Sequence, residues 1–166
     1  MEVTIGIKRT AVMVILKNED RFLLLKRKNE PNKNKFTPVG GKLDPFENPT
    51  DAAIRETFEE TGFKLEKVKY VGSLIETSPQ KYNWNCLVYL AEIPFEKAPP
   101  CNEGELQWIH KDNLLTVPTP PTDLAIYEFV LNGKPFMLNA EFDADLNMIS
   151  MVEEIENKII LNSASQ

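Results

Sequence analysis

Glu56, Glu59 and Glu60 are the residues of this sequence best suited to chemistry. They are separated by three and four positions, which places their carboxylates on one face of a helix. Like charges at these spacings repel one another and weaken an isolated helix by about 0.2–0.5 kcal/mol per pair. A hard divalent cation such as Mg²⁺ prefers oxygen ligands and would relieve this repulsion. The spacing therefore favours a magnesium site, in which Mn²⁺ could substitute.

These glutamates belong to a longer pattern, G-x5-E-x7-R-E-x-x-E-E-x-G followed by an apolar residue. The matching residues are Gly41, Glu47, Arg55, Glu56, Glu59, Glu60, Gly62 and Phe63. The pattern resembles the Nudix box, the signature of the MutT-like pyrophosphohydrolases. Because so many positions match at fixed spacing, the resemblance is specific. It implies an α/β/α sandwich with a mixed β-sheet between helices.

The resemblance also implies roles for the matching residues. Glu59 and Glu60 would be metal ligands, and Glu56 would be a ligand or would hold the attacking water. The carbonyl group of Gly40, the first residue of a glycine pair with Gly41, would complete the metal sphere. A glycine pair is also typical of a simple strand bulge. Bound metal would neutralise phosphate oxygens and lower the pKa of a water molecule.

Two further parts of the site are expected outside this carboxylate group. Arg55 resembles an orienting residue that pairs with a carboxylate such as Glu47. Many family members add a glutamate from a distant loop, and Glu103 lies five residues before Trp108, as in oxidised-purine triphosphatases. Glu105 is the competing candidate for that position.

The C-terminal third carries the indication of substrate. From Trp108 to the segment FVLNGKPF, it resembles the oxidised-purine nucleoside triphosphatases of the mammalian MutT-homologue type. Asp123 falls where that type reads the base edge, although it is equally suited to capping a helix. Thr37 replaces an expected base-reading asparagine, and Pro120 replaces an expected aromatic residue. The resemblance implies hydrolysis of a nucleotide such as 8-oxo-dGTP to the monophosphate and pyrophosphate.

Other side chains are candidates for substrate contacts. Lys26 and Arg27, at the end of an expected strand, would reach phosphates or form a solvated strand end. Four aromatic residues would either stack on a base or pack in the core: Phe36, Tyr82, Trp84 and Phe136.

Other functions compete with the leading one. Pro79 lies near the position where ADP-ribose hydrolases of this superfamily carry a proline, although it also suits a turn. Dinucleoside polyphosphates and capped RNA ends are further substrate classes. A module that senses nucleotides without cleaving them is the non-enzymatic alternative, which the complete motif disfavours.

Composition is that of one soluble domain, which we expect at residues 1–154, with a tail at 155–166. The net charge of −6 argues against a long nucleic acid as partner and leaves a single nucleotide as the expected one. Cys86 and Cys101 form no disulfide framework, and no apolar run has the length of a membrane span. We therefore expect a cytoplasmic protein without a membrane partner. Nothing in the sequence indicates an oligomeric state.

The elements that position these residues follow from periodicity and capping signals. Asn48, Pro49 and Gly62 delimit a helix that carries the glutamates, and its Ala53, Ile54, Thr57 and Phe58 are expected to pack on a sheet. A second helix is expected at 124–131. Strands are expected at 3–16, 21–28, 67–76, 85–93 and 105–110, and a hairpin at 135–152.

Overall fold

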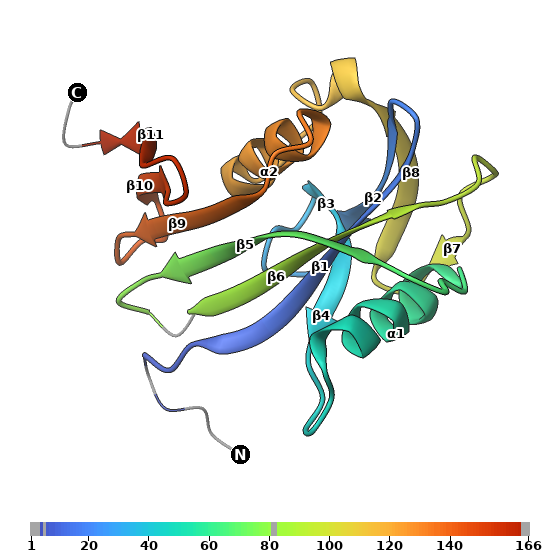
Figure 1. The fold of residues 1–166 in the computed structure, drawn as a ribbon, viewed down its shortest axis with the longest axis horizontal. Coiled ribbons are helices and arrows are strands. Elements are labelled where there is room, and N and C mark those ends of the chain that lie inside the picture. Colours follow the sequence, from blue (N-terminus) through green and yellow to red (C-terminus); the bar gives the residue numbers. More distant parts are fainter. Residues whose placement is uncertain (1–3, 5, 81–82, 164–166) are drawn as a thin grey trace.

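Side chains that alternate along a central strand divide the core of this protein into two halves. The computed structural model describes residue 4 and residues 6–80 and 83–163. Strand β1 (Arg9–Asn18) sends Ile15 into a core that is covered by helix α2, and Val14 and Leu16 into a core covered by helix α1. The two helices therefore cover opposite faces of the sheet (Figure 1).

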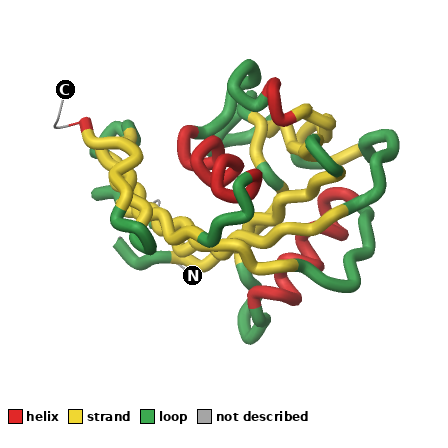
Figure 2. The backbone as a smooth tube through the Cα atoms, turned by 45° about the horizontal axis from the view of Figure 1, so that its top comes forward, coloured by secondary structure: helices red, strands yellow, loops and turns green. Residues whose placement is uncertain are grey.

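The sheet contains eleven strands within the described residues, in the order β11-β10-β9-β5-β6-β1-β2-β8-β7, with β3 beside β2 and β4 beside β1. The strands after β1 are β2 (Arg21–Arg27), β3 (Phe36–Thr37), β4 (Val39–Lys42), β5 (Lys69–Thr77), β6 (Trp84–Glu92), β7 (Pro100–Cys101), β8 (Gly104–His110), β9 (Phe136–Phe142), β10 (Met148–Glu153) and β11 (Lys158–Asn162). β1 runs parallel to β6 and β5 runs parallel to β9, whereas the other pairs are antiparallel. The predicted mixed sheet between helices is confirmed, and Figure 2 shows strands separating the two helices.

Helix α1 (Pro49–Thr61) has the predicted ends. The side chain of Asn48 accepts a hydrogen bond of 3.0 Å from the amide of Asp51, and Pro49 begins the helix. Gly62 closes it at φ 75°, and its amide donates to the carbonyl of Phe58 at 2.8 Å. These ends fix the position of each glutamate around the helix axis, and so the face of α1 on which it lies.

The buried face of α1 differs from the predicted one. Ala53 and Thr57 are buried, but Phe58 is 47% exposed and lies on the outer side of the helix. Thr57 can be buried because its hydroxyl donates to the carbonyl of Ala53 at 2.8 Å. The aromatic ring of Phe58 instead meets the ammonium group of Lys64 at 5.9 Å.

Three larger differences from the predicted elements have a local cause. The first strand begins at Arg9 because Gly6, at φ 85°, and a bond from the amide of Ile7 to the carbonyl of Thr4 form a turn. Helix α2 (Pro121–Leu131) begins three residues early, since a proline suits the first helical position. The segment expected as a tail contains β11, which pairs with β10.

Further described elements complete the chain. A short 3-10 helix, η1 (Lys111–Asn113), follows β8. The predicted hairpin at 135–152 is present as β9 and β10. No helix among the described residues is long and apolar enough to span a membrane.

Candidate active site

A cleft of about 640 Å³ connects β4 and α1 with β5 and the first turn of α2. Its lining includes many of the residues that were predicted for the site: Arg27, Thr37, Gly40, Gly41, Glu56, Glu103 and Asp123. Residues far apart in the sequence therefore meet in one place. Of the α1 carboxylates, Glu56 lines one end of this cleft with Glu103, and Asp123 lines the other end with Glu76.

Arg55 organises the carboxylate end. Its Nε and Nη2 donate to the two oxygens of Glu47, both at 2.8 Å, and these bonds lower the pKa of Glu47 to about 2. Its Nη1 donates to Oε1 of Glu56 at 2.8 Å and to Oε2 of Glu59 at 3.2 Å. Nη2 also donates to the carbonyl of Lys42 at 3.1 Å. The expected pairing of Arg55 with Glu47 is thus part of a wider network that holds α1 against β4.

Glu60 lies deeper than its two neighbours in the motif. It is 8% exposed, and the amide of Gly40 donates to its Oε2 at 3.2 Å. Burial, reinforced by the charge of Glu103, raises the pKa of Glu60 to about 8. Burial likewise raises the pKa of Glu56, against the lowering effect of Arg55. A Cβ atom on Gly41 would overlap the carboxylate of Glu56, so any other residue at this position would displace that carboxylate.

These donors fit a divalent cation in chemistry and in charge. Glu103 repels both Glu56 and Glu60, so the three acidic groups share one negative region that a cation would neutralise. Within the described part of the chain, however, no three Asp, Glu, His or Cys side chains converge as a preformed metal site. Arg55 holds Glu56 and Glu59, and metal binding would have to draw these carboxylates from it.

The two candidates for the distant glutamate lie in different places. Glu103, between β7 and β8, lines the cleft beside the α1 carboxylates. Glu105 is exposed on β8, and its Oε1 accepts a hydrogen bond of 2.8 Å from Gln107. The geometry favours Glu103.

Removal of the buried charge of Glu60 is expected to change stability. Because its folded pKa is raised from 4.5 to about 8, the native state binds more protons than the unfolded state in this window. Through Glu60 alone, stability of the metal-free wild type therefore falls as pH rises through this window, by at most about 1.4 kcal/mol per pH unit. In Glu60→Gln this contribution is expected to disappear, while that of Asp123, whose pKa is also raised, remains. Thermal unfolding at pH 5 and pH 8 in EDTA measures this change in stability. Glu105→Gln, which alters an exposed residue, is the control. An unchanged difference between the two pH values in Glu60→Gln would contradict the assignment.

The opposite end of the cleft is enclosed by polar groups. Asp123 is 4% exposed in the first turn of α2, and the hydroxyl of Thr122 approaches its carboxylate at 3.4 Å. It does not cap the helix, because Pro120 occupies that position. Burial, with the nearby charge of Glu76, raises the pKa of Asp123 to about 8. The buried hydroxyl of Thr37 has no hydrogen-bond partner among the described residues.

The aromatic candidates are distributed differently from the prediction. Phe36 and Phe136 are buried in the core beneath α2, so the prediction of Phe36 as a substrate contact gives way to a packing role. Trp84 lines the cleft, where the guanidinium of Arg9 lies 5.4 Å from its ring. Tyr82 lies outside the described residues.

The two cationic candidates on β2 lie on different faces of the sheet. Arg27 lines the cleft and Lys26 does not, since neighbours on a strand point to opposite faces of the sheet. Lys26 lies outside the lining of this cleft, so Arg27 is the better placed of the two candidates for a phosphate contact.

Glu76 is a cleft residue that sequence reasoning missed. It lies on β5 two residues after the buried Leu74, and both line the cleft. The signal that could have found it was the alternation of this strand, which places Glu76 on the inward face of the sheet. A charged residue on such a face is unusual and therefore informative.

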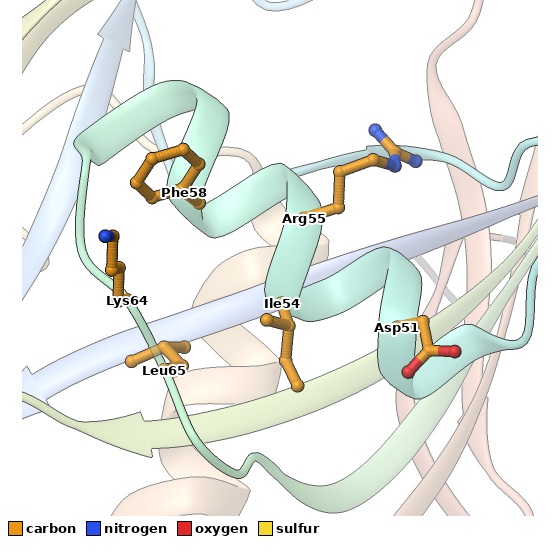
Figure 3. A pocket seen from close by; sticks show the side chains of 6 residues that line it. All are labelled: Asp51, Ile54, Arg55, Phe58, Lys64 and Leu65. Atoms are coloured by element: carbon orange, nitrogen blue, oxygen red, sulfur yellow. The ribbon is translucent and has the colours of Figure 1, made fainter.

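A second hollow lies on the outer side of α1 (Figure 3). It measures about 360 Å³, and its lining residues are Asp51, Ile54, Arg55, Phe58, Lys64 and Leu65. The apolar side chains of Ile54, Phe58 and Leu65 form much of its wall. It brings no group of carboxylates together, so the larger cleft is the candidate active site.

Comparison with known proteins agrees with this geometry. A family model described as NUDIX domain matches residues 7–130. The uncharacterized Nudix hydrolase YvcI of Bacillus subtilis is 27% identical over 125 residues, which are 72% of this chain and 77% of that protein. A putative 8-oxo-dGTP diphosphatase of the same species is 40% identical over 62 residues, which are 37% of this chain and 40% of the relative.

Substrate names differ among the relatives. The NAD-capped RNA hydrolase NudC of Salmonella paratyphi C is 27% identical over 134 residues, which are 80% of this chain and 49% of that protein. Among solved structures, a mutator MutT protein from Bacillus halodurans superposes with a TM-score of 0.76 at 21% identity. That match covers 89% of this chain and 98% of the other. The likeness shows a shared fold.

Proposed function

We propose, since this chain belongs to the NUDIX domain family, that it hydrolyses a nucleoside triphosphate to the monophosphate and pyrophosphate with the help of Mg²⁺. Mn²⁺ is the expected substitute metal. Oxidised purine nucleotides such as 8-oxo-dGTP are the proposed substrates. The proposed compartment is the cytoplasm, whose reducing conditions suit the free thiols of Cys86 and Cys101.

The observation that carries this proposal is the arrangement of the cleft. Glu56 and Glu103 lie at one end, and the buried carboxyl group of Asp123 lies at the other. The first end suits a phosphate chain that binds with a cation, because carboxylates alone would repel it. The second end suits a nucleobase, whose N–H groups a carboxyl group can recognise. One nucleotide would thus occupy both ends.

The mechanism begins with the carboxylate end. Glu56, Glu59, Glu60 and Glu103 would hold the divalent metal, with the carbonyl of Gly40 as a further ligand. When bound, the metal would neutralise phosphate charge and acidify a water molecule. The water oxygen attacks phosphorus, the bond to the leaving pyrophosphate breaks, and the carboxylate group takes up the water's proton. These carboxylates titrate as a coupled set, so the proton belongs to the group.

Cationic side chains have separate tasks in this mechanism. Arg55 holds Glu56 and Glu59 through its Nη1 atom until a metal draws them away, and its bonds to Glu47 would keep it beside them. Arg27 lies on the cleft, and its Nε donates to the carbonyl of Pro31 at 2.9 Å, which holds the guanidinium group close to the proposed phosphate path. Arg27 would therefore bind phosphate, and Arg55 would act on the carboxylates.

A dinucleotide such as ADP-ribose or an NAD cap is the second candidate substrate. It is favoured by the match to NudC, which extends over 80% of this chain. Pro79, the residue associated with ADP-ribose hydrolysis, is absent from the lining of the cleft and lies in a bend after β5. This placement favours the triphosphate.

Hydrolysis of a panel of nucleotides tests the proposal. The panel contains 8-oxo-dGTP, ordinary nucleoside triphosphates, ADP-ribose, dinucleoside polyphosphates and NAD-capped RNA, each with Mg²⁺ and with EDTA. We expect Mg²⁺-dependent release of monophosphate and pyrophosphate, fastest with the oxidised purine. Cleavage of ADP-ribose or capped RNA alone would favour the second candidate. Binding without cleavage of any compound would indicate a sensor.

A further inference from the structure

The base end of the cleft contains a second acidic residue that faces Asp123. On β5, Gly72, Leu74 and Glu76 alternate onto the same face, and Leu74 packs in the core beneath α2. Glu76 is the next inward position, and it reaches the cleft together with Asp123. A strand and the start of a helix thus bring two carboxyl groups to one cleft.

Within the described residues, neither carboxyl group has a strong partner. The ammonium group of Lys8 donates to the backbone carbonyl of Glu76 at 2.8 Å, and no hydrogen bond or ion pair from this part of the chain reaches the Glu76 carboxylate. Asp123 has the 3.4 Å contact from Thr122 alone. Glu76 is half-buried, whereas Asp123 and Thr37 are buried, and buried polar groups are normally paired. The weakly paired Asp123 and the unpartnered hydroxyl of Thr37 therefore point to a ligand that supplies the partners, and Glu76 lies beside them on the same cleft.

The two carboxyl groups are close enough to influence each other. Burial raises the pKa of both groups, and the charge of Glu76 raises that of Asp123 further. Lys35 and Arg27 oppose the rise in pKa at Asp123, and Lys8 opposes the rise at Glu76. Two neighbouring carboxyl groups in a buried site retain one proton between them. One group is then an acceptor of two hydrogen bonds, and the other is a donor.

We infer that Glu76 and Asp123 together bind the base of the substrate and select a purine with a guanine-type edge. The inference rests on the proposed function. A guanine-type edge carries two adjacent N–H donors and one carbonyl oxygen. The carboxylate accepts from both N–H groups, the carboxylic acid donates to the carbonyl oxygen, and the hydroxyl of Thr37 provides a further bond. Adenine and cytosine, which present one exocyclic amino group beside a ring nitrogen, satisfy fewer of these groups.

The comparison of Glu76→Gln with wild type tests this inference. We expect the wild type to have a higher kcat/KM for guanine-type triphosphates than for adenine and cytosine ones. In Glu76→Gln this preference is expected to fall by roughly 10- to 100-fold, mainly through KM, because a buried hydrogen-bonding pair is lost. Asp123→Asn is expected to have a similar effect. Glu141→Gln, which changes an exposed residue of β9, is the matched control and is expected to keep the preference.

The same inference is tested by binding, which separates its failure from failure of the proposed function. Calorimetry with GMP, AMP and CMP in EDTA measures base preference without catalysis. Wild type should bind GMP most tightly, and Glu76→Gln should bind the three alike. If the protein cleaves no triphosphate but shows this pattern, the proposed function fails and the base site stands. A preference that is unchanged in Glu76→Gln and Glu76→Asp, or no preference in wild type, would overturn the inference.

Discussion

Glu59→Gln is expected to lower kcat by about 10³-fold with little change in thermal stability. The side chain of Glu59 is 56% exposed at the rim of α1, and its ion pair is a 3.2 Å contact with Arg55. Exposed pairs contribute little to stability, so loss of this charge should hardly affect folding. The same charge is one of those proposed to hold the metal. A large effect on turnover with a small effect on the fold would separate catalysis from structure.

Steady-state hydrolysis with saturating Mg²⁺, together with the thermal midpoint, measures this outcome. Glu128→Gln removes an exposed carboxylate from α2, away from the cleft lining, and is expected to keep full activity. A weaker metal site should also show as a higher Mg²⁺ concentration at half-maximal rate. Near-normal kcat in Glu59→Gln would mean that the metal ligands have been assigned incorrectly.

Gly40→Ala is expected to have the largest effect on stability, a loss of about 3–5 kcal/mol or failure to fold. Gly40 adopts φ 148°, a conformation that side chains disfavour. A Cβ atom there would overlap the backbone carbonyl oxygen of Val12 on β1. Because Gly40 pairs with Met13, relief of this overlap would require β1 and β4 to separate.

Gly133→Ala is the matched control for backbone strain. Gly133 also has a positive φ, 64°, but a Cβ atom there would meet nothing within 4 Å. Its expected cost is about 1–2 kcal/mol from conformation alone. Urea unfolding of both variants measures the difference. An equal loss in the two variants would show that the close approach of β1 and β4 has no special importance.

Sequence alone sufficed for features that depend on local spacing. The ends of α1 follow from Asn48, Pro49 and Gly62, whose effects act within one helical turn. The pairing of Arg55 with Glu47 follows from the motif and is present. The alternating pattern of most strands likewise predicted their existence, with bounds that differ by a few residues.

Features that depend on tertiary contacts were not predictable in this way. Phe58 is apolar enough for the core, but the close approach of α1 to the sheet favours the small side chains of Ala53 and Thr57 there. Glu76 belongs to no sequence motif. Its proposed role depends on its contact with the same cleft as Asp123, which lies 47 positions later in the sequence. Strand β11 was missed because its partner β10 stabilises it, and short strands are weak signals by themselves.

The parallel pairing of β5 with β9 has a consequence for how activity arises during folding. Leu74 pairs with Leu138, 64 positions later in the chain, and α2 with its Asp123 lies between the two strands in sequence. During synthesis this pairing cannot form before β9 has been made, whereas β8, which follows Glu103 of the carboxylate end, is made earlier. A nascent chain that ends before β9 therefore has the Nudix motif but lacks a completed base end. Selectivity for the base should therefore mature after the carboxylate end during synthesis.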